Sequence, residues 1–136
     1  MGVKIGGKSP TEINTEKILD NVTGDITNST YSHVAGTTED DFLVFTADIQ
    51  DIFIEFDVSG YTVGTLTVRE YVQTDGSNYR QASERVFPTD FDSNVEAIIM
   101  SHHQKNNAYK ITLQKSDSTG VSVPYRYEVV SKDDST

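Results

Sequence analysis

The fold is decided by the stretch IFIEFDVSG YTVGTLTVREYVQ TDGSN YRQASERV, residues Ile52–Val86. In its first part, apolar side chains stand at every second position, which predicts a strand with one buried face and one wet face. Asp75 and Gly76 supply the positive φ angles of a tight β-turn, so we expect a hairpin at Thr74–Asn78. The stretch therefore predicts antiparallel β-structure.

Glu70 interrupts the alternation of the next predicted strand. That strand places Leu66, Val68 and Val72 on its inner face, and Glu70 falls on the same face. Because a carboxylate is costly to bury without partners, we expect a β-bulge, a rim position or an ion pair there. None of these requires a functional role.

The composition limits the possible partners. The chain has 136 residues, enough for one domain with its own core. Eleven Lys plus Arg against 21 Asp plus Glu give a net charge of -10, which repels phosphate backbones, so we expect no nucleic-acid partner. No apolar run reaches the about 20 residues that span a bilayer, so we expect no membrane partner. The absence of cysteine excludes disulfides and thiolate metal sites.

Residues 1–30 contain no aromatic residue and few apolar ones, so they cannot form a core of their own. We predict an extended N-terminal arm over 1–30, a β-sandwich domain over 31–130 and a polar C-terminal tail over 131–136. Lysines that precede the first acid, Glu12, make the tip of the arm basic. Such an arm is ordered most easily by lying on a neighbouring subunit or on a sheet edge. The residues expected to make this assembly contact are Val3, Lys4, Ile5, Lys8, Ile13, Ile18 and Leu19.

Further segments carry strand signals. The apolar run Phe42–Phe45 predicts a central strand buried on both faces, whereas the charged run Tyr79–Phe87 suits an edge strand. Ala97–Met100 is apolar on both faces, which predicts a position inside the protein or at an interface. A second hairpin turn is expected at Ser116–Gly120, and Pro124 predicts an edge or irregular position for the last strand.

Taken together, these signals predict seven or eight short strands, spaced roughly ten residues apart, and no helix. The predicted fold class is all-β, an antiparallel two-sheet sandwich with an extended N-terminal arm. Jelly-roll and immunoglobulin-like topologies both remain open. The inner faces of the last two strands are predicted to hold Tyr109, Ile111, Leu113, Val121, Val123, Tyr125, Tyr127 and Val129.

Candidate catalytic and metal-binding residues are few. Adjacent residues of a strand point in opposite directions, so His102 and His103 are not expected to hold a metal together. The run Asp90–Glu96 places oxygen side chains at every second position, as a calcium loop does, but it lacks the glycine and the bidentate glutamate. A surface turn is the better interpretation of this run. No serine stands on a glycine-flanked elbow, and we expect no enzyme, catalytic residue, cofactor or functional metal site.

Tyrosines offer an alternative function. Tyr61, Tyr71 or Tyr79, if outward, could form the aromatic platform with which carbohydrate-binding modules hold sugars. The chain has no tryptophan, which such platforms favour, and tyrosine is also an ordinary strand former. A carbohydrate-binding β-sandwich module for host-surface attachment is therefore the second hypothesis.

Four segments resemble small β-sandwich proteins of tailed-virus particles: Thr67–Tyr71, Thr74–Arg80, Tyr109–Leu113 and Tyr125–Tyr127. The similarity covers roughly residues 42–130, and those families supply capsid decoration, head-fibre or tail components. The resemblance implies a structural component of the virion without chemistry of its own. Its implied partners are capsid or tail proteins and copies of the same chain. No functional residue is carried over, because such families are defined by assembly surfaces.

Overall fold

The computed structural model describes residues 24–47, 49–88, 95–104 and 107–131. Their regular structure is entirely β-strand: β1 (Asp25–His33), β2 (Asp40–Phe45), β3 (Ile49–Asp57), β4 (Thr65–Val72), β5 (Arg80–Pro88), β6 (Ala97–His103), β7 (Tyr109–Lys115) and β8 (Val121–Ser131). Accordingly, no helix in this part of the chain is long and apolar enough to cross a membrane. The first strand begins within the range predicted as the arm, so the sandwich includes residues 25–30.

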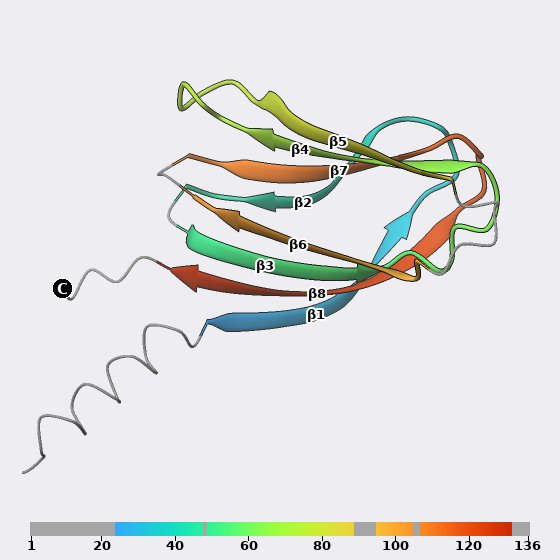
Figure 1. Cartoon of the computed structure of the whole chain (residues 1–136), viewed down its shortest axis with the longest axis horizontal. Coiled ribbons are helices and arrows are strands. Elements are labelled where there is room, and N and C mark those ends of the chain that lie inside the picture. The colour runs from blue at the N-terminus through green and yellow to red at the C-terminus, as the bar shows by residue number, and fades with distance from the viewer. Residues whose placement is uncertain (1–23, 48, 89–94, 105–106, 132–136) are drawn as a thin grey trace, which may run out of the picture.

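The strands form two antiparallel four-stranded sheets that pack as two layers (Figure 1). The first sheet has the order β1-β8-β3-β6 and the second sheet has the order β2-β7-β4-β5. The chain pairs like a folded ribbon, because β4 pairs with β5, β3 with β6, β2 with β7 and β1 with β8. This nested pairing is the eight-stranded jelly roll. The predicted sandwich is confirmed, and its topology is that of the jelly roll rather than the immunoglobulin fold.

The hairpin between β4 and β5 is the turning point of this ribbon. Asp75 Oδ1 accepts hydrogen bonds from the backbone N–H groups of Ser77 and Asn78, at 2.9 and 2.8 Å. Gly76 has a φ of 79°, a left-handed conformation that residues with a Cβ rarely adopt. The predicted hairpin at Thr74–Asn78 is confirmed.

The core lies between the inner faces of the two sheets. Alternate residues of β3, β4, β7 and β8 point into it, as predicted. Aromatic rings pack edge to face there: the Phe42 centroid lies 5.0 Å from that of Phe56 and 5.3 Å from that of Tyr125, an arrangement that adds to the gain from burial. The buried apolar side chains are Phe42, Leu43, Phe45, Ile52, Ile54, Phe56, Val58, Tyr61, Leu66, Val68, Ile98, Met100, Tyr109, Ile111, Leu113 and Val123.

Two predictions about strand positions are wrong. The strand β2 lies at an edge of the second sheet, and Val44 on it is 56% exposed, so Phe42–Phe45 is not buried on both faces. The run is continuously apolar for a different reason: a register shift between Asp41 and Leu43 lets adjacent side chains both be buried. The turn at Ser116–Gly120 does not form a hairpin, because it joins β7 of the second sheet to β8 of the first sheet.

The remaining strand predictions have mixed outcomes. The charged strand β5 lies at an edge, as predicted. In β6, Ile98 and Met100 are buried while Ile99 is 76% exposed, so the run Ala97–Met100 contacts the core on one side only. The strand β8 is interior to its sheet, so of the two positions that Pro124 predicts, edge or irregular, the edge is wrong for the strand as a whole. The proline is tolerated because the pairing of β8 with β3 ends at Tyr125, which leaves only β1 beside it.

Glu70 lies at a β-bulge, one of the positions that the sequence predicts for it. The register of β4 against β5 shifts between Glu70 and Tyr71. The Glu70 carboxylate accepts hydrogen bonds from the hydroxyls of Tyr109 at 2.5 Å and Ser83 at 2.6 Å. These partners offset the cost of placing a carboxylate on the inner face.

Candidate assembly surface

The outer face of the first sheet carries the side chains that alternate with the core residues. Its central part spans β8, β3 and β6, where the pairing register aligns residues in rows across the sheet. Two adjacent rows consist of Glu128, Phe53 and Ser101, and of Arg126, Glu55 and Ile99.

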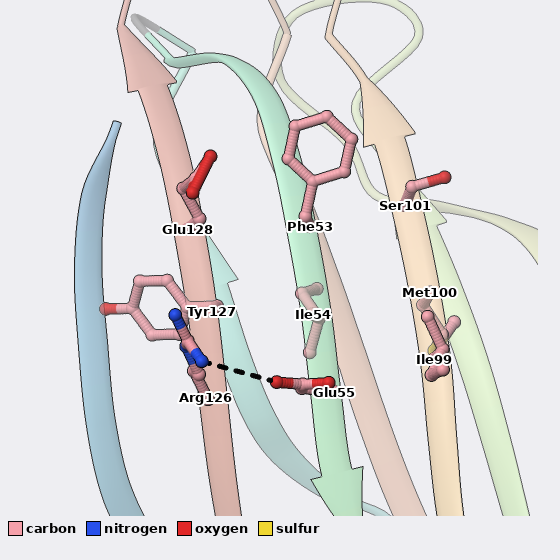
Figure 2. Close-up of a pocket in the computed structure, with 9 residues that line it drawn as sticks. All are labelled: Phe53, Ile54, Glu55, Ile99, Met100, Ser101, Arg126, Tyr127 and Glu128. Carbon is pink, nitrogen blue, oxygen red and sulfur yellow. Dashed lines mark ion pairs between the residues drawn. The ribbon is translucent and has the colours of Figure 1, made fainter. Parts of the chain in front are cut away.

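These six residues line an open groove of about 480 Å³, which we call the sheet groove (Figure 2). The Phe53 ring stands over β3, and Ile99 lies on the neighbouring strand β6. The two side chains are 50% and 76% exposed. Ile26 of β1, in the same row as Glu128, adds a further exposed apolar side chain. Large apolar side chains gathered on one exposed face of a domain indicate a contact surface.

The sheet groove is acidic as well as apolar. Arg126 is the only lysine or arginine in the four strands of the first sheet, and its Nη1 atom lies 3.9 Å from Glu55 Oε1. Both side chains are about half exposed, so water screens this ion pair and it stabilises the fold little. The carboxylates on the outer side of the same strands are Asp51, Glu55, Asp57 and Glu128. The face therefore attracts cationic groups.

On the outer face of the second sheet, polar and charged side chains contact one another within the chain. The Glu39 carboxylate accepts hydrogen bonds from the hydroxyls of Tyr71 and Thr112, each at 2.5 Å. Its Oε1 atom also lies 3.4 Å from Arg69 Nη1. The Nε atom of the same arginine lies 3.0 Å from Glu84 Oε1. Burial alone would raise the pKa of Glu39, but the hydrogen bonds and the guanidinium charge outweigh burial and lower it. Because these polar groups already have partners, this face offers less to a ligand than the sheet groove does.

His102 and His103 point in opposite directions, as predicted. The His102 ring stacks on Tyr109 with the ring centroids 4.0 Å apart, whereas His103 Nδ1 lies 2.5 Å from Asp51 Oδ1. Within the described ranges, no group of three His, Cys, Asp or Glu side chains is arranged to hold a metal ion. The possible calcium run Asp90–Glu96 lies outside the described residues up to position 94.

The three tyrosines considered for sugar binding do not form one platform. Tyr61 is buried, and its hydroxyl lies 2.8 Å from His33 Nδ1. Tyr71 and Tyr79 both face Lys110, whose Nζ atom is 5.3 and 4.6 Å from their ring centroids. The condition that Tyr61 faces outward is therefore not met. Its loop has no alternation that would reveal a hydroxyl paired with a buried histidine.

All seven predicted arm contacts, Val3, Lys4, Ile5, Lys8, Ile13, Ile18 and Leu19, lie outside the described residues. Sequence reasoning missed Phe53, whereas Ile99 belongs to the run Ala97–Met100 that was expected inside the protein or at an interface. Each is an apolar residue at an outward position of its strand, and this departure from alternation is the sequence signal that could have marked the surface. Their meeting depends on the pairing of β3 with β6, which alternation within either strand does not reveal.

The chain is thus a jelly-roll domain with an apolar and acidic groove on one outer face. No family model matches its sequence, and no curated protein matches it at a significant level. A solved chain from Bacillus endospore appendages, which form disulfide-linked pili, has a TM-score of 0.56 at 10% identity, covering 82% of this chain and 90% of that chain. The Yersinia pseudotuberculosis-derived mitogen has a TM-score of 0.48 at 9% identity, covering 83% and 91%. At such identities the likeness to the appendage chain shows the fold alone.

Proposed function

We propose that this protein is a non-enzymatic structural subunit of a virus particle that binds copies of itself and a capsid or tail lattice. The observation that carries the self-association is the exposure of Phe53 and Ile99 on neighbouring strands of one sheet. Removing apolar surface from water contributes about 25 cal/mol per Å². A second copy that covers the sheet groove supplies this gain.

Self-association also fits the pilus-forming protein that shares the fold. That protein comes from endospore appendages that are disulfide-linked pili. This chain has no cysteine, so its copies would be held together by packing and charge alone. An exposed apolar groove is the kind of surface that such an assembly needs.

The placement in a virion rests on the resemblance of the strand and turn segments to tailed-virus proteins. The jelly roll is a common architecture of viral capsid domains, although lectins and other proteins share it. Glycan binding has less support, because Tyr61 is buried against His33 rather than exposed. Mass spectrometry of purified virus particles tests the location, and finding the chain only outside particles would remove the virion from the proposal.

Light scattering and negative-stain electron microscopy of the full chain test the self-association. We expect oligomers or polymers whose fraction grows with protein concentration, and a strong decrease in the Phe53→Ser, Ile99→Ser double variant. Val86→Ser is the matched control, because Val86 is similarly exposed but lies on β5 of the second sheet. A chain that stays monomeric at high concentration, or a double variant that assembles as well as the control, would contradict the proposal.

A further inference from the structure

The basic tip of the N-terminal arm matches the chemistry of the sheet groove. The residues before Glu12 carry Lys4 and Lys8 and no acid, whereas the strands around the groove present four carboxylates outward and only Arg126 as a lysine or arginine. We infer that residues 1–8 of a second copy bind in the sheet groove in an extended form. This inference rests on the proposed self-association and names the two elements that make the contact.

The arm sequence MGVKIGGK contains both apolar and cationic side chains, which match the apolar and acidic side chains of the groove. In an extended segment alternate side chains share a side, so Val3 and Ile5 lie together and can cover Phe53 and Ile99. Gly6 and Gly7 have no side chain, which lets the backbone lie close to the sheet. Lysine stems are long and flexible, so their ammonium groups can reach the carboxylates at the groove rim.

The second sheet is a poorer site for a basic segment. Two cations face outward on it, against one on the first sheet, and the Glu39 carboxylate already has hydroxyl and guanidinium partners. A lysine-bearing arm would meet repulsion there and find few free acceptors. The cations that face outward there are Arg69 and Lys110, and they already pair with the carboxylates Glu84 and Asp41.

The arm is long enough to reach a neighbour. Residues 9–24 separate the basic tip from β1, and at about 3.3 Å per extended residue they can span about 50 Å. The outermost strands of a four-stranded sheet lie only about 15 Å apart. Each copy has one arm and one groove, so the contact is heterologous and leaves a free arm and a free groove for further copies. This contact therefore adds subunits in series.

Engineered disulfides test the inference cleanly, because the chain has no cysteine of its own. The full-length Ile5→Cys variant is mixed with isotope-labelled full-length Ile99→Cys, and the mixture is oxidised under mild conditions. We expect a disulfide-linked pair of unlike copies. Its yield should be at least about tenfold above that with Val86→Cys, which is a similarly exposed site on the second sheet.

Three outcomes separate this inference from the proposed function. Equal yields at Ile99 and Val86 would overturn the arm-in-groove contact, and if light scattering still shows assembly, the proposed function stands. A dilute Ile5→Cys, Ile99→Cys double variant that closes only within one chain would overturn the assignment to a second copy. Charge reversal supplies the last test: Lys4→Glu with Lys8→Glu should weaken assembly, and Glu128→Lys should restore part of it. A lack of rescue in an assembling protein would count against the contact.

Discussion

The imidazole Nδ1 atom of His33 and the hydroxyl of Tyr61 lie 2.8 Å apart, and both side chains are buried. On the other side of the ring, His33 Nε2 lies 3.3 Å from Asp40 Oδ2. This arrangement connects β1, the loop after β3 and the start of β2 at one end of the sandwich. It suits a neutral imidazole that accepts the Tyr61 hydrogen at Nδ1 and carries its own hydrogen at Nε2.

His33 makes the stability of the fold depend on pH. Burial lowers its pKa, the Lys115 charge lowers it further, and Asp40 opposes both. The unfolded chain, with a histidine pKa of about 6.5, therefore takes up protons more readily than the folded chain. We expect the free energy of unfolding to be highest above about pH 6.5 and to fall as the pH drops through that value. Urea unfolding between pH 8 and pH 5 measures this slope.

Variants assign this slope to its source. The pKa of His102 is also lowered, chiefly by burial, so His102 contributes with the same sign. We expect His33→Gln to make the slope shallower and His33→Gln with His102→Gln to remove most of it. An unchanged slope in the double variant would assign the acid sensitivity to carboxylates instead.

The charges around His33 should shift its pKa in opposite directions. Lys115→Gln removes a cation that disfavours protonation, so we expect the pKa of His33 to rise. Asp40→Asn removes the carboxylate that favours protonation, so we expect the pKa to fall. Titration of the imidazole signals by NMR measures both shifts. Shifts of the same sign would show that repacking, rather than charge, controls this site.

Glu70 should be worth more to stability than a surface carboxylate. Tyr109 is fully buried, and its hydroxyl donates to Glu70 at 2.5 Å, so Glu70→Ala leaves a buried donor without its acceptor. We expect a loss of about 1–3 kcal/mol in the free energy of unfolding, measured by urea denaturation. Glu70→Gln keeps an acceptor oxygen and should lose less. If alanine and glutamine were equally harmful, the negative charge rather than the hydrogen bond would be the stabilising feature.

The strands were predictable from the sequence where a local pattern, such as alternation or a turn signal, is enough to place each side chain. The alternation of Ile52, Ile54 and Phe56 sets which side of β3 is buried, and the Asp-Gly pair sets the β4–β5 turn. Strand order was not predictable, because it depends on pairings between distant segments. Phe42–Phe45 shows the limit: a bulge and a central position produce the same apolar run.

The candidate site was harder to predict than the fold for the same reason. The exposure of Phe53 and Ile99 becomes a groove only when β3 and β6 lie side by side. Tyr61 shows the opposite case, in which a residue considered as a candidate surface tyrosine lies in the core, where His33 from β1 supplies a polar partner. Sequence patterns report the faces of single strands, and the sites of this protein lie between strands.

Substitutions of Gly76 test the turn of the β4–β5 hairpin. The Gly76 φ of 79° is left-handed, and a Cβ added there would meet no other atom within 4 Å. Gly76→Ala therefore adds backbone strain without a clash, and we expect it to lower the free energy of unfolding by about 1 kcal/mol. Gly76→Asn should cost less, because asparagine adopts this conformation more readily. Urea denaturation of the two variants gives the comparison. An alanine variant as stable as the parent would show that the turn relaxes to another conformation, and the left-handed residue would then not be needed to join β4 to β5.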